Sequence, residues 1–361
     1  MNQTVTIGWD IGGAHLKAVQ LNAYGEVVQV LQLPCPLWKG LVQLEAAINN
    51  MLQAFKIAPA EAGHAVTMTG ELVDCFENRE QGVMEISSLV AKLLGKETLF
   101  YAANAGFVPL EGVSTNIVGI ASTNWHASAS ALAMHVQDAL LIDIGSTTTD
   151  IIAIEAGRVK NTGLSDASRM QADSLVYTGV VRTPVMALAQ KLMFEGAEFN
   201  VAAEYFATMA DVYRLTGDLL PEYDMSDTAD GKGKTALESA RRLARMIGHD
   251  VESNSLEAWV NLANTCKTLQ MQQIKAALLK HLKPNMTIIG AGAGSFLVQQ
   301  LALSLPKQHA CEPISMRVAG MPSNALVGGH ANLSLQHDLE LCFPAYAVAT
   351  LAKKYVATQY A

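Results

Sequence analysis

One pattern occurs twice in this chain and limits its possible folds more than any other feature. A β-branched apolar run reaches an aspartate, a glycine-rich turn follows, and a second strand and a tight turn lead into a third strand. The pattern occupies residues 5–33, with its aspartate at Asp10, and residues 139–160, with its aspartate at Asp143. Apolar runs separated by short turns of this kind predict β-hairpins. The duplication predicts two topologically similar α/β domains that face one cleft.

A third apolar run, residues 286–289, leads into a glycine-rich stretch at residues 290–294 and then into a predicted apolar helix. This arrangement suits a nucleotide or a diphosphate, because backbone N–H groups at a helix N-terminus attract anions. A dinucleotide-binding turn is the alternative, since Glu312 follows at a suitable spacing. The late position in the chain and Ser295 in place of the last glycine disfavour that alternative.

The predicted domain boundaries follow from these runs. The first α/β domain is expected at residues 1–137 and the second at residues 138–342. A C-terminal helix is expected in residues 343–361, where it could pack back on the first domain.

Within the second domain, the sequence predicts a helical insertion at about residues 184–283. Apolar residues at three-to-four spacing, such as Val201, Tyr205 and Met209, indicate helices there. A polar loop interrupts the insertion at residues 219–234, and Thr235 is the predicted N-cap of the next helix.

Composition and missing motifs exclude several classes of protein. The chain has 361 residues and a net charge of −8, whereas a nucleic-acid-binding protein would carry a basic face. Its 5 cysteines form no CxxC pair, and neither an HExxH nor a GxSxG motif occurs, which argues against zinc-hydrolase and serine-esterase chemistry. No signal peptide and no run of about 20 apolar residues is recognisable. We therefore expect a cytoplasmic protein that binds neither nucleic acid nor a membrane.

The aspartates and the glycine turns predict a site for a metal and a phosphate group. An aspartate at the carboxyl end of a strand can hold hydrated Mg²⁺, and the glycines after it let several N–H groups point at one anion. We predict that Asp10, Asp143 and Asp150 serve the metal, with turn capping as the alternative. The predicted phosphate- or nucleotide-binding residues are Gly12, Gly13, Ala14, Lys17, Gly145, Ser146, Thr147, Thr148, Gly290, Ala291, Gly292 and Gly294.

Several charged residues have two interpretations each. Lys17 is a candidate to neutralise phosphate, or else a lysine on a solvated strand face. Asp230 and Lys232 lie in a glycine-rich stretch that predicts either a mobile lid over a substrate or an exposed solubilising loop. Arg241 and Arg245 are one turn apart on a predicted helix, which favours a solvated charged face over an anion site.

The three runs, in this order, resemble the first phosphate, second phosphate and adenosine motifs of the actin-like ATPase superfamily. More narrowly, the chain resembles the hydantoinase A/oxoprolinase family, in its short branch linked to tetrahydromethanopterin-dependent C1 transfer. The segments that carry the narrower resemblance are TGELVDCF at residues 69–76, YTGVVRTP at 177–184, TADGKGK at 228–234 and ARRLAR at 240–245. The resemblance implies an α/β fold of two actin-like (ribonuclease H-like) domains around a cleft, with the helical insertion in the second.

The resemblance also implies roles for residues within the matched segments. Asp74 and Arg182 are implied to bind substrate, with structural ion pairs as the alternative, and Asp230 and Lys232 belong with them as substrate-binding candidates.

An activity is implied as well, because archaeal members of this branch are associated with methanofuran biosynthesis. The expected reaction displaces diphosphate from an aminomethylfuran-methyl diphosphate with the phenol of a γ-glutamyltyramine-like amine. A furfuryl carbon ionises readily, so the protein must mainly neutralise diphosphate and hold the phenol in line. The implied partners are these two small molecules and Mg²⁺. ATP is a possible ligand that is not expected to be consumed.

One position departs from the superfamily pattern. Actin-like kinases often carry a hydroxyl residue after the first Gly-Gly, where this chain has Ala14 followed by His15. The change disfavours kinase geometry and makes His15 a predicted catalytic residue together with Asp10 and Asp143. Two other hypotheses stay open: an ATP-dependent kinase or a hydantoinase/oxoprolinase-like hydrolase on the same fold, although the chain is shorter than hydantoinase A proper, and a non-catalytic nucleotide-binding regulator.

Overall fold

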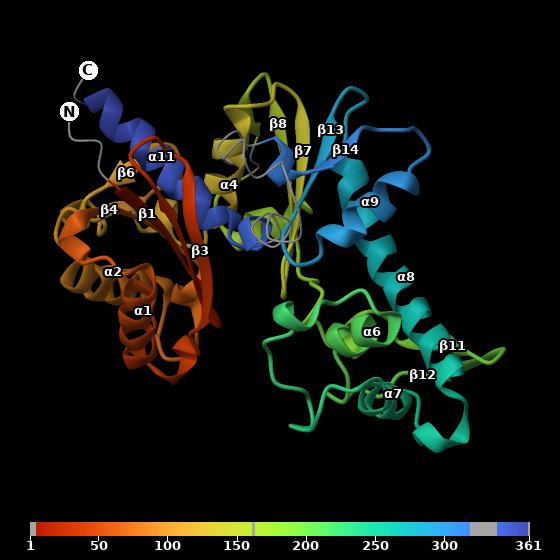
Figure 1. Cartoon of the computed structure of the whole chain (residues 1–361). Helices are drawn as coiled ribbons and strands as arrows, with labels where there is room; N and C mark the ends of the chain where they lie inside the picture. Colours follow the sequence, from red (N-terminus) through yellow and green to blue (C-terminus); the bar gives the residue numbers. More distant parts are fainter. Residues whose placement is uncertain (1–4, 161–162, 318–337, 360–361) are drawn as a thin grey trace. The chain divides into compact units, whose positions relative to one another are not determined.

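The chain forms two compact units, shown in a computed structural model that describes residues 5–160, 163–317 and 338–359 (Figure 1). The first unit draws on Met1–Ala139, Ala153–Arg169 and Pro313–Ala361, and the second on Leu140–Ile152 and Met170–Glu312. The boundaries between the units therefore fall within three strands, β7 (Ala139–Ile144), β8 (Thr149–Glu155) and β14 (Cys311–Pro313).

The first unit is built on a six-stranded sheet in the order β3-β2-β1-β4-β5-β6. β1 pairs antiparallel with β2 and parallel with β4, β2 pairs antiparallel with β3, and β4 pairs parallel with β5. The first five strands thus have the ribonuclease H-like order that was expected. The strands are β1 (Val5–Ile11), β2 (His15–Leu21), β3 (Val27–Pro34), β4 (Ala62–Met68), β5 (Leu99–Tyr101) and β6 (Phe107–Val108).

Helices cover both faces of this sheet, because successive side chains of a strand point to opposite faces. Ile7, Trp9 and Ile11 are buried in one core with residues of α1 and α2. Gly8 faces α11, and a side chain there would overlap the carbonyl oxygen of Ala345. The helices of this unit are α1 (Leu41–Phe55), α2 (Arg79–Leu94), α3 (Ile117–Ile120), α4 (Asn124–Ala133) and α11 (Phe343–Gln359), and α5 (Asp166–Gln171) ends in the second unit.

The second sheet repeats this order. It runs β10-β8-β7-β13-β14, and β9 pairs with the far end of β8. Strands β9, β8, β7, β13 and β14 therefore take the places of β3, β2, β1, β4 and β5, which confirms the duplication read from the two aspartate-containing runs. The remaining strands are β7 (Ala139–Ile144), β9 (Arg158–Lys160), β10 (Leu175–Val176), β13 (Thr287–Ala291) and β14 (Cys311–Pro313).

The helical insertion is present between β9 and β13, with one correction. Residues 191–200 form a hairpin of β11 (Lys191–Phe194) and β12 (Ala197–Asn200) instead of a helix. Its two turn residues, Glu195 and Gly196, both have positive φ, as a type I′ hairpin turn requires. The helices of the insertion are α6 (Met209–Thr216), α7 (Ala236–Arg245) and α8 (Leu256–His281).

The predicted helical residues Val201 and Tyr205 lie before α6, so that part of the prediction is wrong. The physical reason is a helix start at the N-cap Thr208, whose N–H donates to the Asp211 carboxylate (3.1 Å) in a capping box. Apolar spacing alone does not reveal where such a cap interrupts a pattern.

Other predicted elements are confirmed. The Thr235 hydroxyl accepts the Glu238 N–H at the start of α7, α9 (Ser295–Leu303) follows the third glycine-rich run, and a helix occupies most of the C-terminal segment. None of the described helices combines the length and the apolar character needed to cross a bilayer.

Candidate functional site

Residues 145–148, the second glycine loop, connect β7 to β8 in the second unit. The loop is a tight reversal in which the Gly145 N–H donates to the Thr148 carbonyl (2.8 Å). Ser146 and Thr147 are half-buried, and their hydroxyl oxygens lie 3.4 Å apart. The loop is therefore accessible and rich in hydrogen-bond donors.

Residues 178–183, the bracing segment, hold the second glycine loop from one side. The N–H of Val180 donates to the Gly145 carbonyl (3.0 Å). The N–H groups of Val181 and Arg182 both donate to the Ser146 carbonyl (3.1 and 2.8 Å). Two successive carbonyl groups of the loop thus point at the bracing segment.

This orientation determines where the loop's donors point. A trans peptide bond is planar, so its N–H points opposite to its C=O. The N–H groups of Ser146 and Thr147 share peptide bonds with the two braced carbonyls and therefore point away from the bracing segment. Consecutive N–H groups presented in this way form a nest for an anion.

Residues 290–294, the third glycine loop, lie against the end of β7 in the same unit. Gly292 has a φ of 81°, and a side chain there would overlap Oδ1 of Asp143. The Gly294 N–H donates to the Ile144 carbonyl (2.8 Å), and α9 begins at Ser295. The structure therefore brings the second and third runs together within the second unit, with the Asp143 carboxylate at their junction.

In the first unit, Asp10 lies near the end of β1 and is only 4% exposed. Burial raises the pKa of its carboxyl, although the Lys17 charge and a hydrogen bond from Asn124 Nδ2 (3.4 Å) act in the opposite direction. Lys17 is the cross-strand partner of Asp10 on β2. It therefore compensates Asp10, a role that neither interpretation of Lys17 included. A cation nearby would favour the charged form of this buried carboxyl group.

Residues 12–15, the first glycine loop, are braced as the second loop is. The Gly12 N–H donates to the His15 carbonyl (3.0 Å), which closes the turn. The Gly13 and Ala14 carbonyls accept from the N–H groups of Leu37 (3.0 Å) and Cys35 (2.8 Å). By the same planarity, the N–H groups of Ala14 and His15 point away from residues 35–37.

The segment TGELVDCF, residues 69–76, borders the first glycine loop. An added side-chain atom at Gly70 would lie 3.2 Å from the Ile11 carbonyl oxygen, and one at Gly13 would lie 2.7 Å from Val73 Cγ1. Asp74, the next residue along the chain, is exposed. The predicted substrate residue Asp74 thus follows directly on a residue that packs against this loop.

Sequence reasoning missed two polar residues of the first unit. Asn124, at the start of α4, contacts Asp10. Glu71 is 1% exposed and accepts a hydrogen bond from the Ser122 hydroxyl at Oε1 (2.5 Å), and burial raises its pKa to about 7. The only available signal was that Glu71 lies inside TGELVDCF, and nothing local marks Asn124.

The two other substrate candidates lie on residues 228–234. Asp230 Oδ1 accepts from the fully buried Arg242 of α7 (2.9 Å) and from the Lys232 N–H (3.2 Å). Burial tends to raise the pKa of Asp230, but these two donors hold it below its ordinary value. Lys232 is exposed. The loop is thus fastened to α7 by Arg242, which the sequence analysis did not single out.

Arg242 also joins this loop to α6. It donates to Asp211 Oδ1 (2.8 Å), which in turn accepts from Arg214 (2.8 Å). Arg214 makes two further bonds to the Asp224 carboxylate (2.6 and 2.7 Å). Movement of the loop as a lid would first have to break the Arg242–Asp230 pair.

Arg182 is exposed on the bracing segment, and its N–H donates to the Ser146 carbonyl of the second glycine loop.

The predicted metal ligands have the right chemistry for Mg²⁺, which prefers oxygen donors and keeps several waters. Asp10 belongs to the first unit, and Asp143 and Asp150 belong to the second. Among the residues that the structure describes, no three His, Cys, Asp or Glu side chains converge as a group of direct metal ligands. Binding through bridging waters, as the sequence suggests, stays a prediction.

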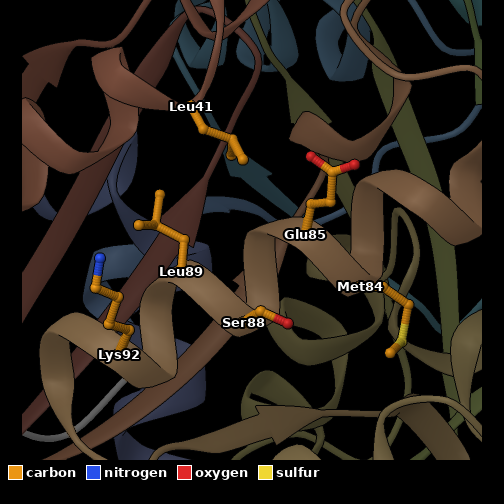
Figure 2. Close-up of a pocket in the computed structure, with 6 residues that line it drawn as sticks. All are labelled: Leu41, Met84, Glu85, Ser88, Leu89 and Lys92. Carbon is orange, nitrogen blue, oxygen red and sulfur yellow. The ribbon is translucent and has the colours of Figure 1, made fainter.

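A hollow of about 360 Å³ on the first unit has a different lining (Figure 2). Leu41 of α1 and residues of α2 surround it, and none of them is a predicted site residue. The lining residues are Leu41, Met84, Glu85, Ser88, Leu89 and Lys92. The anion-binding features described above lie at the glycine loops instead.

The sequence of this chain is similar to a known family and to named proteins. Residues 62–326 match the family model Hydantoinase/oxoprolinase. A protein of Methanocaldococcus jannaschii, named (4-{4-[2-(gamma-L-glutamylamino)ethyl]phenoxymethyl}furan-2-yl)methanamine synthase, is 32% identical over 259 residues, which cover 72% of this chain and 76% of that protein. A protein of the same name from Methanococcus vannielii is 34% identical over 161 residues, covering 43% of this chain and 72% of that protein.

A likeness to solved structures concerns the fold alone. The nucleotide-free structure of acetone carboxylase superposes with a TM-score of 0.52 at 10% sequence identity, covering 96% of this chain and 70% of that chain. It supports the two-unit α/β architecture over nearly the whole chain.

Proposed function

Because the chain belongs to the hydantoinase/oxoprolinase family, we propose that it is a transferase that forms the aryl ether of (4-{4-[2-(γ-L-glutamylamino)ethyl]phenoxymethyl}furan-2-yl)methanamine. The observation that carries this proposal is the 32% identity to the M. jannaschii synthase over 72% of this chain. The product would serve methanofuran or methylofuran biosynthesis, and hence tetrahydromethanopterin-linked C1 transfer, in the cytoplasm.

The proposed reaction exchanges one C–O bond for another. The bond between the furfuryl carbon and the diphosphate breaks, and its electron pair leaves with the diphosphate. The phenol oxygen of γ-glutamyltyramine forms the new bond to the same carbon and loses its proton to a base. Delocalisation of positive charge into the furan ring lowers the barrier to ionisation, so the protein must mainly stabilise the leaving diphosphate.

The chain's own groups suit that task. The Ser146 and Thr147 N–H groups point away from the bracing segment and are available to diphosphate oxygens, and the third glycine loop opens a helix beside Asp143. Arg182, exposed on the bracing segment, is the proposed cationic contact. In the first unit, the imidazole of His15 is the proposed acceptor of the phenol proton.

In the second unit, the carboxylates of Asp143 and Asp150 would hold Mg²⁺ through water, and Asp10 is the candidate for the same role in the first unit. When bound, Mg²⁺ would supply positive charge to the departing diphosphate. We propose that ATP is not consumed, because Ala14 supplies no hydroxyl where actin-like kinases contact phosphate.

The test is a condensation assay with the purified protein, Mg²⁺, an aminomethylfuran-methyl diphosphate and γ-glutamyltyramine. We expect the ether product by mass spectrometry and one pyrophosphate per ether, with or without ATP. Omitting the phenol should leave only slow release of pyrophosphate. ATP-dependent phosphorylation of a small alcohol, or ATP-dependent ring opening of a hydantoin, without ether formation would refute the proposal.

A further inference from the structure

A buried glutamine in the middle of α8 faces the bracing segment. Gln270 is fully buried, and its Nε2 donates to the Thr178 hydroxyl oxygen (2.7 Å) and to the Gly179 carbonyl (2.8 Å). Its Oε1 accepts from the hydroxyl of Tyr213 on α6 (2.5 Å). Three of the four hydrogen-bonding positions of this amide are thus used, in a place that water does not reach.

The neighbours fix which way the amide points. The Gly179 carbonyl can only accept a hydrogen bond, so the amino group of Gln270 must face it. The carbonyl end then faces Tyr213, whose hydroxyl donates. Burial raises the pKa of Tyr213, which keeps this donor protonated. The two hydrogen bonds therefore run in one direction, from Tyr213 to Gln270 and from Gln270 to Gly179.

Gly179 is held on every side. Its carbonyl accepts from Gln270, its N–H donates to the Thr183 hydroxyl (2.7 Å), and the preceding carbonyl of Thr178 accepts from the Thr149 hydroxyl (2.7 Å). Its Cα lies directly under the second glycine loop, where an added side-chain atom would be 2.5 Å from the Thr147 nitrogen. Gly179 thus connects the Gln270 amide to the second glycine loop, because it bonds to the one and packs against the other.

From these contacts we propose that Gln270 is a positioning residue for the second glycine loop. It fixes the bracing segment, and the bracing segment turns two loop carbonyls inward and so directs the Ser146 and Thr147 N–H groups outward. The substrate it affects is the diphosphate donor, not the phenol. This inference rests on the proposed function for its kinetic part, while its binding part concerns pyrophosphate alone.

Tyr213 has a smaller role in positioning the loop, through its hydrogen bond to Gln270. Its hydroxyl donates to the Gln270 carbonyl oxygen (2.5 Å) and so acts on the bracing segment through Gln270. Removing it leaves both amide donors on Thr178 and Gly179. We therefore expect a graded series in which loss of the glutamine amide has a larger effect on the loop than loss of the tyrosine hydroxyl.

The test compares Gln270→Met, Tyr213→Phe and a control, Gln273→Met. Gln273 lies on the same helix and also donates to a backbone carbonyl, that of Leu188 (3.1 Å), which is outside the bracing segment. Gln270→Met should weaken inorganic pyrophosphate binding, measured by titration calorimetry with Mg²⁺, about tenfold, and raise the KM for the diphosphate donor similarly. Tyr213→Phe should change both by less than about threefold, and Gln273→Met by less than about twofold.

A general loss of folding is distinguished by the KM for the phenolic amine, which should stay the same in folded Gln270→Met. If Gln270→Met does not fold, Thr183→Val removes only the hydroxyl that accepts the Gly179 N–H and should weaken pyrophosphate binding in the same way. Unchanged pyrophosphate affinity in either variant, or an equal loss in Gln273→Met, would overturn the inference. Weakened pyrophosphate binding in a protein whose wild type forms no ether would refute the proposed reaction and leave the positioning role standing.

Discussion

Substitution of Gly179 tests directly whether the bracing segment holds the second glycine loop, because the loop lies against this residue. An added Cβ would lie 2.5 Å from the Ser146 carbonyl carbon, 2.5 Å from the Thr147 nitrogen and 2.6 Å from the Gly145 oxygen. All three are backbone atoms, so no side-chain rotation can relieve the overlap. In Gly179→Ala the bracing segment and the loop must therefore separate.

The cost follows from the bonds that join the two segments. Separation strains or breaks the hydrogen bonds from Val180 to Gly145 (3.0 Å) and from Val181 and Arg182 to Ser146 (3.1 and 2.8 Å). At about 1 kcal/mol for each, the free energy of unfolding should fall by about 3 kcal/mol. A domain of ordinary stability survives that loss. The N–H groups of Ser146 and Thr147 would lose their fixed direction, so pyrophosphate affinity should fall by about tenfold or more.

Urea denaturation and calorimetric titration with pyrophosphate measure the two effects. The control is Gly63→Ala on β4, where an added side-chain atom would approach only the Val5 carbonyl oxygen, at 3.9 Å. That variant should match the wild type in both measurements. A Gly179→Ala protein with wild-type stability and wild-type pyrophosphate affinity would show that the bracing segment does not hold the loop.

Three further changes test other parts of the structure. Burial raises the folded-state pKa of Glu71 from its ordinary 4.5 to about 7, so the stability that its protonated form contributes is fully present below pH 4.5 and is lost as pH rises through about 7. Glu71→Gln should remove this loss, which is about 3 kcal/mol in the free energy of unfolding. Equal pH dependence of stability in the wild type and in Glu71→Gln would contradict the argument. Arg242→Leu should cost about 3 kcal/mol in urea denaturation because it leaves buried Asp211 short of a partner, whereas Arg241→Leu should cost less than about 0.5. Asp143→Asn should abolish the Mg²⁺-dependent rise in Tm that pyrophosphate gives, and Asp173→Asn, which loses an exposed pair with Lys280, should retain it.

The strands and glycine loops could be predicted from the sequence because their signals are local. An apolar run ending in Asp10 or Asp143, followed by glycines, defines a strand and its turn within a dozen residues. The pattern's repetition predicted two domains of similar topology, and the two sheets share the same strand order. The helix starts at Thr235 and near Ser295 were predictable for the same reason, since caps and glycine turns are read within a few positions.

The residues that the sequence did not reveal depend on contacts between distant segments. Gln270 and Tyr213 are 57 positions apart, and Gln270 and Thr178 are 92 apart. Arg242 looked like one of three charges on an exposed helix, and only the fold shows that it is the buried one. Glu71 resembled any loop glutamate until the Ser122 hydroxyl was found beside it. Buried polar pairs of this kind produce no periodic pattern in the sequence, because each pair needs only one residue from each of two distant segments.

The central claim is that the furfuryl C–O bond breaks and diphosphate leaves with the bridging oxygen. It is tested by placing ¹⁸O at the oxygen that joins the furfuryl carbon to phosphorus, and by analysing the products of one condensation with γ-glutamyltyramine by mass spectrometry in the absence of ATP. The account predicts that the label appears in the released pyrophosphate and that the ether oxygen comes unlabelled from the phenol. Label retained on the furfuryl carbon would mean that the P–O bond breaks instead, and would contradict the account.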